Sequence, residues 1–219
     1  LQIEDDRVKY FEHLAQGKQP YIGYKFLCLL NKYGIVKSIW TTNFDGLVER
    51  AAHNAFITPI CINLDCADRI YRTESSNELL CISLHGDYKY SSLKNTSKEL
   101  DSQHPTFVAA LKRYFNDKNL IVIGYSGRDK SLMSALTEAF SEKGSGRIYW
   151  CGYGSHISPE VESLLRTARE ASRDAYYIDT DGFDKTMFSL VINCFQADIE
   201  KKKEIMSILE SVPEDNDTS

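Results

Sequence analysis

The stretch IVKSIWTTNFDGLVERAA, residues 35–52, joins a β-branched and apolar run to a polar turn and then to a helical pattern. Residues 35–41 favour a strand, because branched and aromatic side chains fit a pleated, half-buried surface. Leu47 to Ala52 begins a helix, and the turn TTNFDG lies between the two. This order is typical of open parallel α/β sheets, which bind ligands at such turns.

Strand-like and helix-like segments alternate along the rest of the chain. We predict further strands at residues 56–63, 79–84, 120–123, 147–151 and 175–178, and further helices at 5–15, 21–33, 105–115, 131–140, 159–171 and from 185 onward. This alternation predicts an α/β fold with a doubly wound, mainly parallel, Rossmann-like sheet. We expect one domain over residues 1–209, followed by a flexible acidic tail at 210–219.

Composition narrows the classes of protein that the chain can belong to. Its 219 residues carry a formal net charge of −5, which argues against nucleic acid as a direct partner, because phosphates call for clustered Lys and Arg. The sequence has no run of about 20 apolar residues and no signal-peptide pattern at its start, so we expect a cytoplasmic protein without a membrane span. Most of its six cysteines lie in apolar runs, so we expect reduced thiols, and none of them form a CxxC pair, so we expect no metal.

Four polar loops follow predicted strands, at residues 41–46, 85–87, 124–129 and 152–154. Because the carboxyl ends of parallel strands share one edge of a sheet, these loops can converge on a single crevice. His85 is the best catalytic candidate there, since an imidazole can accept a proton at neutral pH. A histidine that ends an apolar strand is more often structural. The surrounding loops favour the catalytic interpretation.

Asn43 and Asp45 follow the strand that opens the motif. The Asn43 amide both donates and accepts hydrogen bonds, which suits a ribose hydroxyl or a water, and Asp45 adds a carboxylate acceptor. Asn and Asp also cap helices, and the two roles are compatible.

The glycines of GYSGRD, residues 124–129, could let phosphate or ribose approach a helix N-terminus, or could serve only a tight turn. Ser126 and Asp129 could cap the next helix, and residues 152–154 have the same ambiguity.

Taken in this order, TTNFDGL, LHGD, GYSGRD and YWCGYG resemble the signature motifs of the sirtuin superfamily over residues 20–184. The resemblance implies that the chain handles NAD. It assigns Thr42, Asn43 and Asp45 to the nicotinamide and its ribose, His85 to catalysis, Gly124 and Ser126 to the adenosine side, and Gly152 and Asp181 to the adenine.

Three departures from the family pattern refine this expectation. The glycine-rich loop after the family's first strand has no counterpart, so we expect a domain that is incomplete on its N-terminal side. The zinc-bearing cysteine pairs of protein deacylases are missing, and with them the small zinc domain that forms one wall of the acyl-lysine groove. TTNFD, GYSGRD and YWCGYG look closest to divergent bacterial sirtuin-like domains fused to antiviral defence proteins, which implies NAD hydrolysis.

The resulting hypothesis is an NAD hydrolase that releases nicotinamide and ADP-ribose as the effector domain of a bacterial anti-phage protein, and that forms a homo-oligomer through this or flanking domains. One alternative is an NAD-dependent protein deacylase or ADP-ribosyl transferase. The other is a catalytically silent module for nucleotide binding or oligomerisation. Without the first loop, this module is a serious alternative for the residues 1–219 by themselves.

Overall fold

The computed structural model describes residue 13 and residues 17–43, 45–63, 75–84 and 104–211. Its elements are α2 (Ile22–Lys32), β1 (Ser38–Thr41), α3 (Leu47–Asn54), β2 (Thr58–Asn63), β3 (Glu78–Ser83), α5 (His104–Tyr114), β4 (Leu120–Ile123), α6 (Lys130–Phe140), β5 (Ile148–Gly152), α7 (Pro159–Glu170), β6 (Ala175–Asp179), α8 (Phe183–Phe195) and α9 (Ile199–Glu210). The predicted helix at 5–15 and most of the predicted tail lie outside the described residues. The other predicted strands and helices are present.

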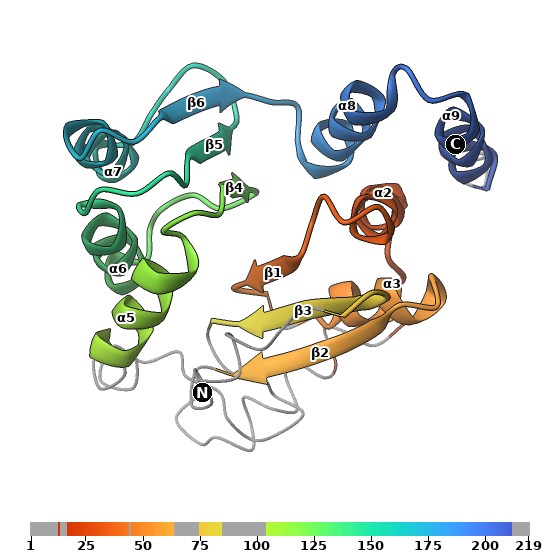
Figure 1. Ribbon diagram of the computed structural model, residues 1–219, viewed down its shortest axis with the longest axis horizontal. Helices are drawn as coiled ribbons and strands as arrows, with labels where there is room; N and C mark the ends of the chain where they lie inside the picture. The colour runs from red at the N-terminus through yellow and green to blue at the C-terminus, as the bar shows by residue number, and fades with distance from the viewer. Residues whose placement is uncertain (1–12, 14–16, 44, 64–74, 85–103, 212–219) are drawn as a thin grey trace.

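The strands form two three-stranded parallel sheets, in the orders β1-β3-β2 and β4-β5-β6. In the first sheet Ile39 lies opposite Cys81, and in the second Val122 lies opposite Trp150. The parallel α/β architecture is therefore confirmed. The described strands fall into two sheets, because β1 and β4, whose edges face each other, are not hydrogen bonded to each other (Figure 1).

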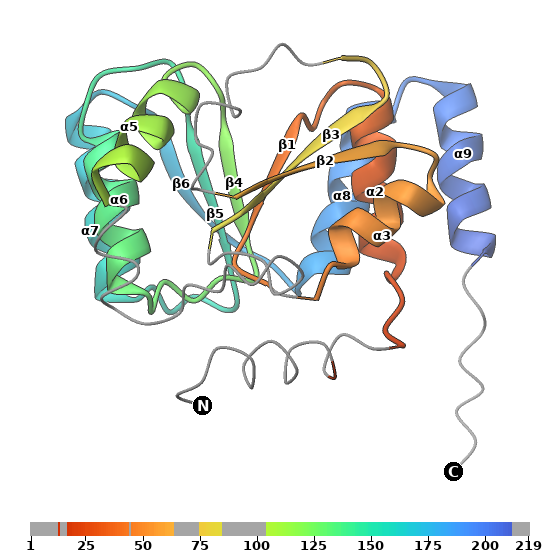
Figure 2. The same ribbon diagram turned by 90° about the horizontal axis from the view of Figure 1, so that it is seen from below.

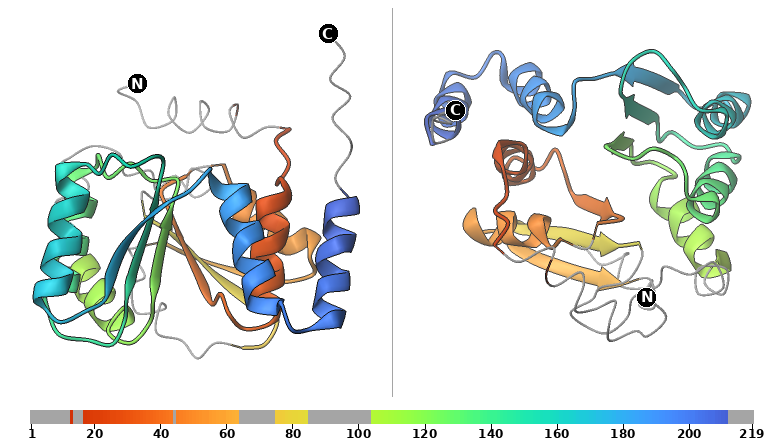
Figure 3. Two further views of the ribbon diagram at one scale, coloured as in Figure 1. Left: turned by 90° about the horizontal axis from the view of Figure 1, so that it is seen from above. Right: turned by 180° about the vertical axis from the view of Figure 1, so that it is seen from behind.

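β3 is apolar over most of its length and buries both of its faces. Leu79 and Cys81 belong to a core with α2, α3, α8 and α9, which we call the α2–α8 core. Leu80 and Ile82 belong to a core with α5, α6 and α7, which we call the α5–α7 core. Figures 2 and 3 show these two groups of helices on opposite sides of the strands. The fold is therefore doubly wound, as the alternation of elements predicts.

Both cores continue from the first sheet into the second. Ile148 and Trp150 of β5 lie in the α5–α7 core together with Leu80 and Ile82 of β3. On the other side, Ile123 of β4 packs against the α2–α8 core. The two sheets therefore act as one layer between two layers of helices, although no strand ladder joins them.

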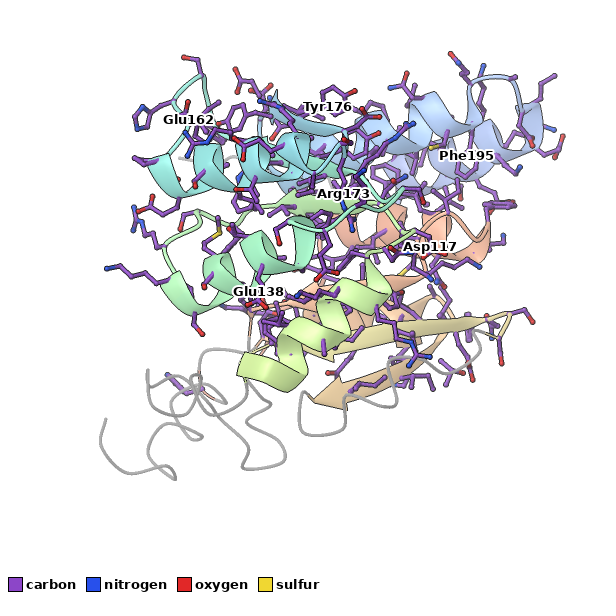
Figure 4. All side chains as sticks on the ribbon, turned by 60° about the vertical axis from the view of Figure 1, so that its left-hand side comes forward. Asp117, Glu138, Glu162, Arg173, Tyr176 and Phe195 are labelled. Atoms are coloured by element: carbon purple, nitrogen blue, oxygen red, sulfur yellow. The ribbon has the colours of Figure 1, made fainter. Side chains whose placement is uncertain are left out.

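Arg173 is a buried cation that ties together three loops beside the second sheet (Figure 4). Its Nε donates a hydrogen bond to the carbonyl of Glu142 at 2.7 Å, and its Nη1 donates one to the carbonyl of Phe115 at 2.7 Å. The guanidinium also lies over the ring of Phe140, 4.9 Å from its centroid. Burial lowers the pKa of Arg173, and these contacts compensate for the water that the cation gives up.

We predict that Arg173→Ala lowers the free energy of unfolding by about 3 kcal/mol, because it removes a packed side chain and leaves buried carbonyls without their donor. Arg166→Ala on α7 is the matched control. Its side chain is 68% exposed, and its Nε lies 4.0 Å from a carboxylate oxygen of Glu170. The free energy of unfolding should therefore fall by less than about 0.5 kcal/mol. Urea unfolding of the two variants and the wild type measures both values. Equal losses would contradict the role given to Arg173.

Candidate functional site

The loops that follow β1, β4, β5 and β6 lie at one end of the strand layer, its carboxyl edge (Figure 2). The last described residue after β3 also reaches this edge, because the N–H of Leu84 donates to the carbonyl of Thr41 at 2.9 Å. His85, the next residue and the predicted catalytic base, lies outside the described residues. The expected convergence of loops at one edge is therefore seen for the segments that the structure describes.

The loop after β1 is organised by side chains that bond within it. The hydroxyl of Thr41 accepts a hydrogen bond from the N–H of Asn43 at 3.0 Å. Asp45 accepts from the N–H of Leu47 at 3.0 Å and from the Asn43 amide at 3.4 Å. Asp45 thus occupies one donor of the first turn of α3. Asn43 is exposed, and its side-chain oxygen has no hydrogen bond to any described residue, so it can face a ligand.

Tyr24 and Asp184 stand beside this loop and were not among the residues that the sequence singled out. Burial, together with the carboxylates of Asp45 and Asp184, raises the pKa of Tyr24 to about 12. Asp184 accepts a hydrogen bond from the N–H of Gly23 at 2.7 Å, and the ring of Tyr24 packs on Phe183 with centroids 4.9 Å apart. The start of α8 is thereby fixed against the start of α2. The motif DTDGFD, at the end of the last predicted strand, was the available signal for Asp184.

The loop after β4 divides into a part used by the fold and a part open to a ligand. Asp129 caps α6 by accepting from the N–H groups of Ser131 at 2.9 Å and Leu132 at 3.1 Å, which settles its role as a cap. Gly124 has a φ of +71°, and a Cβ placed there would meet nothing within 4 Å. Ser126 is exposed. Gly124 and Ser126 are therefore the residues of this loop that a ligand can approach.

The loop after β5 has a conformation fixed by β6. The N–H of Gly154 donates to Asp179 at 2.7 Å, and the Tyr177 hydroxyl donates to the carbonyl of Gly154 at 2.9 Å. A Cβ on Gly152 would collide with the Tyr177 hydroxyl, so packing explains this glycine. Tyr153 lies between the two glycines and is 78% exposed. The loop thus presents an aromatic ring rather than unpaired backbone groups, which the glycine pattern did not indicate.

Asp181 follows β6 and is exposed, with an ion pair to Lys185 at 3.3 Å. It lies three residues before Asp184 and so belongs to the same edge of the layer as the other loops. Thr42, the remaining predicted contact, is half-buried directly after β1.

The described residues contain no group of three or more His, Cys, Asp or Glu side chains placed to hold a metal ion. Within the same residues, no helix combines the length and the apolar character that crossing a membrane requires.

The raised pKa of Tyr24 leads to a prediction about alkaline stability. The folded protein keeps this phenol protonated from its ordinary pKa of 10.0 up to about 12, whereas the unfolded chain loses the proton above 10.0. Its contribution to stability is therefore fully present below pH 10.0 and is lost as the pH rises toward 12. Tyr24→Phe should reduce this decline.

Urea unfolding at about pH 9 and about pH 11 measures the decline. Tyr153→Phe, which removes a hydroxyl from a ring that is 78% exposed, is the control and should behave as the wild type does. A decline of the same size in Tyr24→Phe and in the wild type would contradict the burial of this phenol beside two carboxylates.

A comparison with protein families matches the part of the chain that carries these loops. A family model described as "SIR2-like domain" matches residues 37–178, from just before β1 to the end of β6, and so includes the loops after β1, β4 and β5. A comparison with curated proteins gave no match. SIR2-like domains use NAD as a substrate. Because the match covers more than half of the chain, and the structure over these residues is a parallel α/β layer, the chain belongs to the SIR2-like domain family.

Proposed function

We propose that this chain is an NAD glycohydrolase, which cleaves NAD to nicotinamide and ADP-ribose. The observation that carries the proposal is the loop after β1 of a SIR2-like domain, where Asp45 accepts a hydrogen bond from the N–H of Leu47, the first residue of α3, and also holds the exposed Asn43 amide. An amide fixed in this way can orient a ribose hydroxyl and a water without a further loss of side-chain entropy. Family membership supplies NAD as the substrate.

The reaction breaks the bond between the anomeric carbon of the ribose and the nicotinamide nitrogen. A water oxygen bonds to that carbon, the bonding electrons return to the ring, and the water loses one proton. The transition state resembles an oxocarbenium ion, as in glycoside hydrolysis. Nicotinamide leaves as a neutral ring, so no acid is needed to protonate it. The protein has to orient the ribose, place the water and stabilise the developing positive charge.

In this proposal Asn43 positions the ribose and the water, and Asp45 adds binding and negative charge. Asp184, which approaches Tyr24 from α8 together with Asp45, adds a second carboxylate on the same side. His85 acts as the general base, through a ribose hydroxyl or the water. Thr42 completes the nicotinamide side.

The remaining predicted contacts hold the rest of the dinucleotide. Gly124 and Ser126 would contact the adenosine side, where Gly124 leaves open space next to its backbone. Gly152 and Asp181 would lie near the adenine. The exposed ring of Tyr153, between Gly152 and Gly154, is available to the same part of the ligand.

Hydrolysis is preferred over deacylation because the sequence contains no CxxC pair. The zinc-bound module that forms one wall of the acyl-lysine groove in deacylases therefore has no counterpart among its motifs. Release of acyl-ADP-ribose from an acyl-lysine peptide would establish deacylation instead. Binding of NAD without release of nicotinamide would favour a silent nucleotide-binding module.

We further propose that the chain is the effector domain of a bacterial anti-phage protein and acts in the cytoplasm as a homo-oligomer. The resemblance of its motifs to antiviral sirtuin-like domains supports the first part. Exposed apolar side chains on one face of the second sheet, Ile121, Tyr176 and Ile178, support self-association of this or a flanking domain.

We also propose that one more parallel strand completes the domain between β1 and β4. The strands on either side share two cores, yet among the described residues β1 pairs only with β3 and β4 only with β5. The glycine-rich loop that the family's motifs imply is proposed to follow this strand.

Backbone direction makes this strand testable residue by residue. The carbonyls of Lys37 and Thr41 accept from β3, so the amides of Ser38 and Trp40 point to the opposite side. Leu120 donates to Arg147, so the amides of Ile121 and Ile123 point away from β5. These four amides should exchange quickly with deuterium in residues 1–219 and slowly in a protein that includes the added strand, as measured by NMR. Ile39 and Val122 are internal controls, protected in both. Unchanged exchange of the four amides would contradict the added strand.

Asn43→Ala in the full-length protein should lower the rate of nicotinamide release from NAD by at least about 100-fold, because the ribose and water lose the group that orients them. Asn193→Ala on α8 is the matched control, since its exposed amide bonds only locally, to the carbonyl of Ser189 at 2.8 Å. Thermal unfolding checks that both variants fold. Release at the wild-type rate by Asn43→Ala would overturn the assignment.

A further inference from the structure

The proposed reaction uses none of the cysteines on the α2–α8 side of the strand layer. These are Cys28 on α2, Cys61 on β2 and Cys81 on β3. Cys61 on β2 and Cys81 on β3 are directly opposite each other in the register of the two parallel strands. Ile60 and Ile62, the neighbours of Cys61, pack against the α5–α7 core. Because side chains alternate along a strand, Cys61 must point to the other face, where Cys81 joins the α2–α8 core.

The distance between the two strands suits a covalent link. Neighbouring strands lie about 4.8 Å apart, and the Cα atoms of disulfides are roughly 4.4 to 6.8 Å apart. The two thiols interact in the reduced protein: a hydrogen bond with Cys61, together with burial, raises the pKa of Cys81. Because Cys61 and Cys81 are already paired in the register of β2 and β3, no strand has to shift its register for their sulfur atoms to meet.

The two cysteines differ in their access to solvent, and this difference sets the order of events. Cys61 is exposed on β2, an edge strand, whereas Cys81 is buried on β3, the central strand of the same sheet. A reagent from solution can reach Cys61 first. Cys81 is held as a neutral thiol and can react only with a partner that is already next to it.

We propose that Cys61 and Cys81 form a reversible redox pair, in which Cys61 reacts with a hydroperoxide and Cys81 then closes a disulfide between β2 and β3. In the first step the Cys61 thiolate attacks a peroxide oxygen, the O–O bond breaks, and hydroxide leaves and takes up a proton. In the second step the Cys81 sulfur gives up its proton and attacks the Cys61 sulfenic acid, and water leaves. Two thiols and one hydrogen peroxide thus give one disulfide and two waters, with two electrons passing to the peroxide.

A link at this position connects the β2–β3 pair just before the chain continues to His85. Cys81 lies two residues before Ser83, the last residue of β3, and four before His85. Oxidation would therefore fix the strand that leads into the predicted catalytic loop. The proposal rests on the sheet register and on solvent access alone, so it stands whether or not the chain hydrolyses NAD.

The test is to treat the full-length reduced protein with equimolar hydrogen peroxide, and to analyse its peptides by mass spectrometry with and without a reductant. Trypsin, which cleaves after Arg69 and Arg72, combined with a protease that cleaves before Asp65, places Cys61, Cys66 and Cys81 on separate peptides. The expected product is one cross-linked pair, Cys61 with Cys81, that has lost two hydrogens and disappears on reduction. A Cys61–Cys66 link, or no link at all, would overturn the proposal.

Variants separate the two roles. Cys61→Ser should leave Cys81 unmodified, because a buried thiol is protected from the reagent. Cys81→Ala should instead leave Cys61 as a sulfenic acid that dimedone traps, and Cys81→Ser checks the result if the alanine variant folds poorly. Cys194→Ser, which changes an exposed cysteine on α8, is the matched control and should keep the cross-link. Oxidation of Cys81 in the Cys61→Ser protein would show that the proposed order of reaction is wrong.

Discussion

β3 is buried on both faces, and a parallel strand in that position needs a layer of helices on each side. Leu79 and Cys81 satisfy one layer, and Leu80 and Ile82 the other. The strands of this layer all run in the same direction, and crossover connections join them. The loop that follows each strand therefore lies at the same edge of the layer. The position of the candidate site is thus a consequence of how β3 is buried.

Several polar groups at this edge serve the fold, which reduces the number available to a ligand. Asp45 and Asp129 each accept backbone N–H groups at the start of a helix, and Asp179 fixes the loop after β5. These bonds satisfy donors that would otherwise be unpaired. Asn43 and Tyr153, which are both exposed, are held by the loops that these carboxylates organise. The same carboxylates therefore stabilise the helices and prepare the site.

The division of the strands into two sheets is the feature in which this chain departs from a continuous doubly wound layer. Ile123 and Ile148 share cores with residues of the first sheet, so apolar packing holds the halves together where no backbone hydrogen bonds do. Apolar packing is not directional, so it can hold the two sheets together without a shared strand ladder. The ladder between β2 and β3 is continuous by contrast, and it brings Cys61 and Cys81 face to face.

The sequence by itself determined the element order, the parallel α/β class and the loops that carry chemistry, because hydrophobic periodicity and turn residues are local properties. It placed Asn43 at a strand-to-helix turn, and it left open whether Asp45 and Asp129 cap helices. Only the tertiary structure decided that Asp129 caps α6, whereas Gly46 is the N-cap residue of α3 and Asp45 bonds the N–H of Leu47. It alone also decided that Gly152 is required by Tyr177, and that Tyr24 and Asp184 stand beside the Asn43 loop. These facts depend on contacts between segments far apart in the chain, such as α2 with α8. No local pattern contains them, because they arise when the two helical layers close on β3.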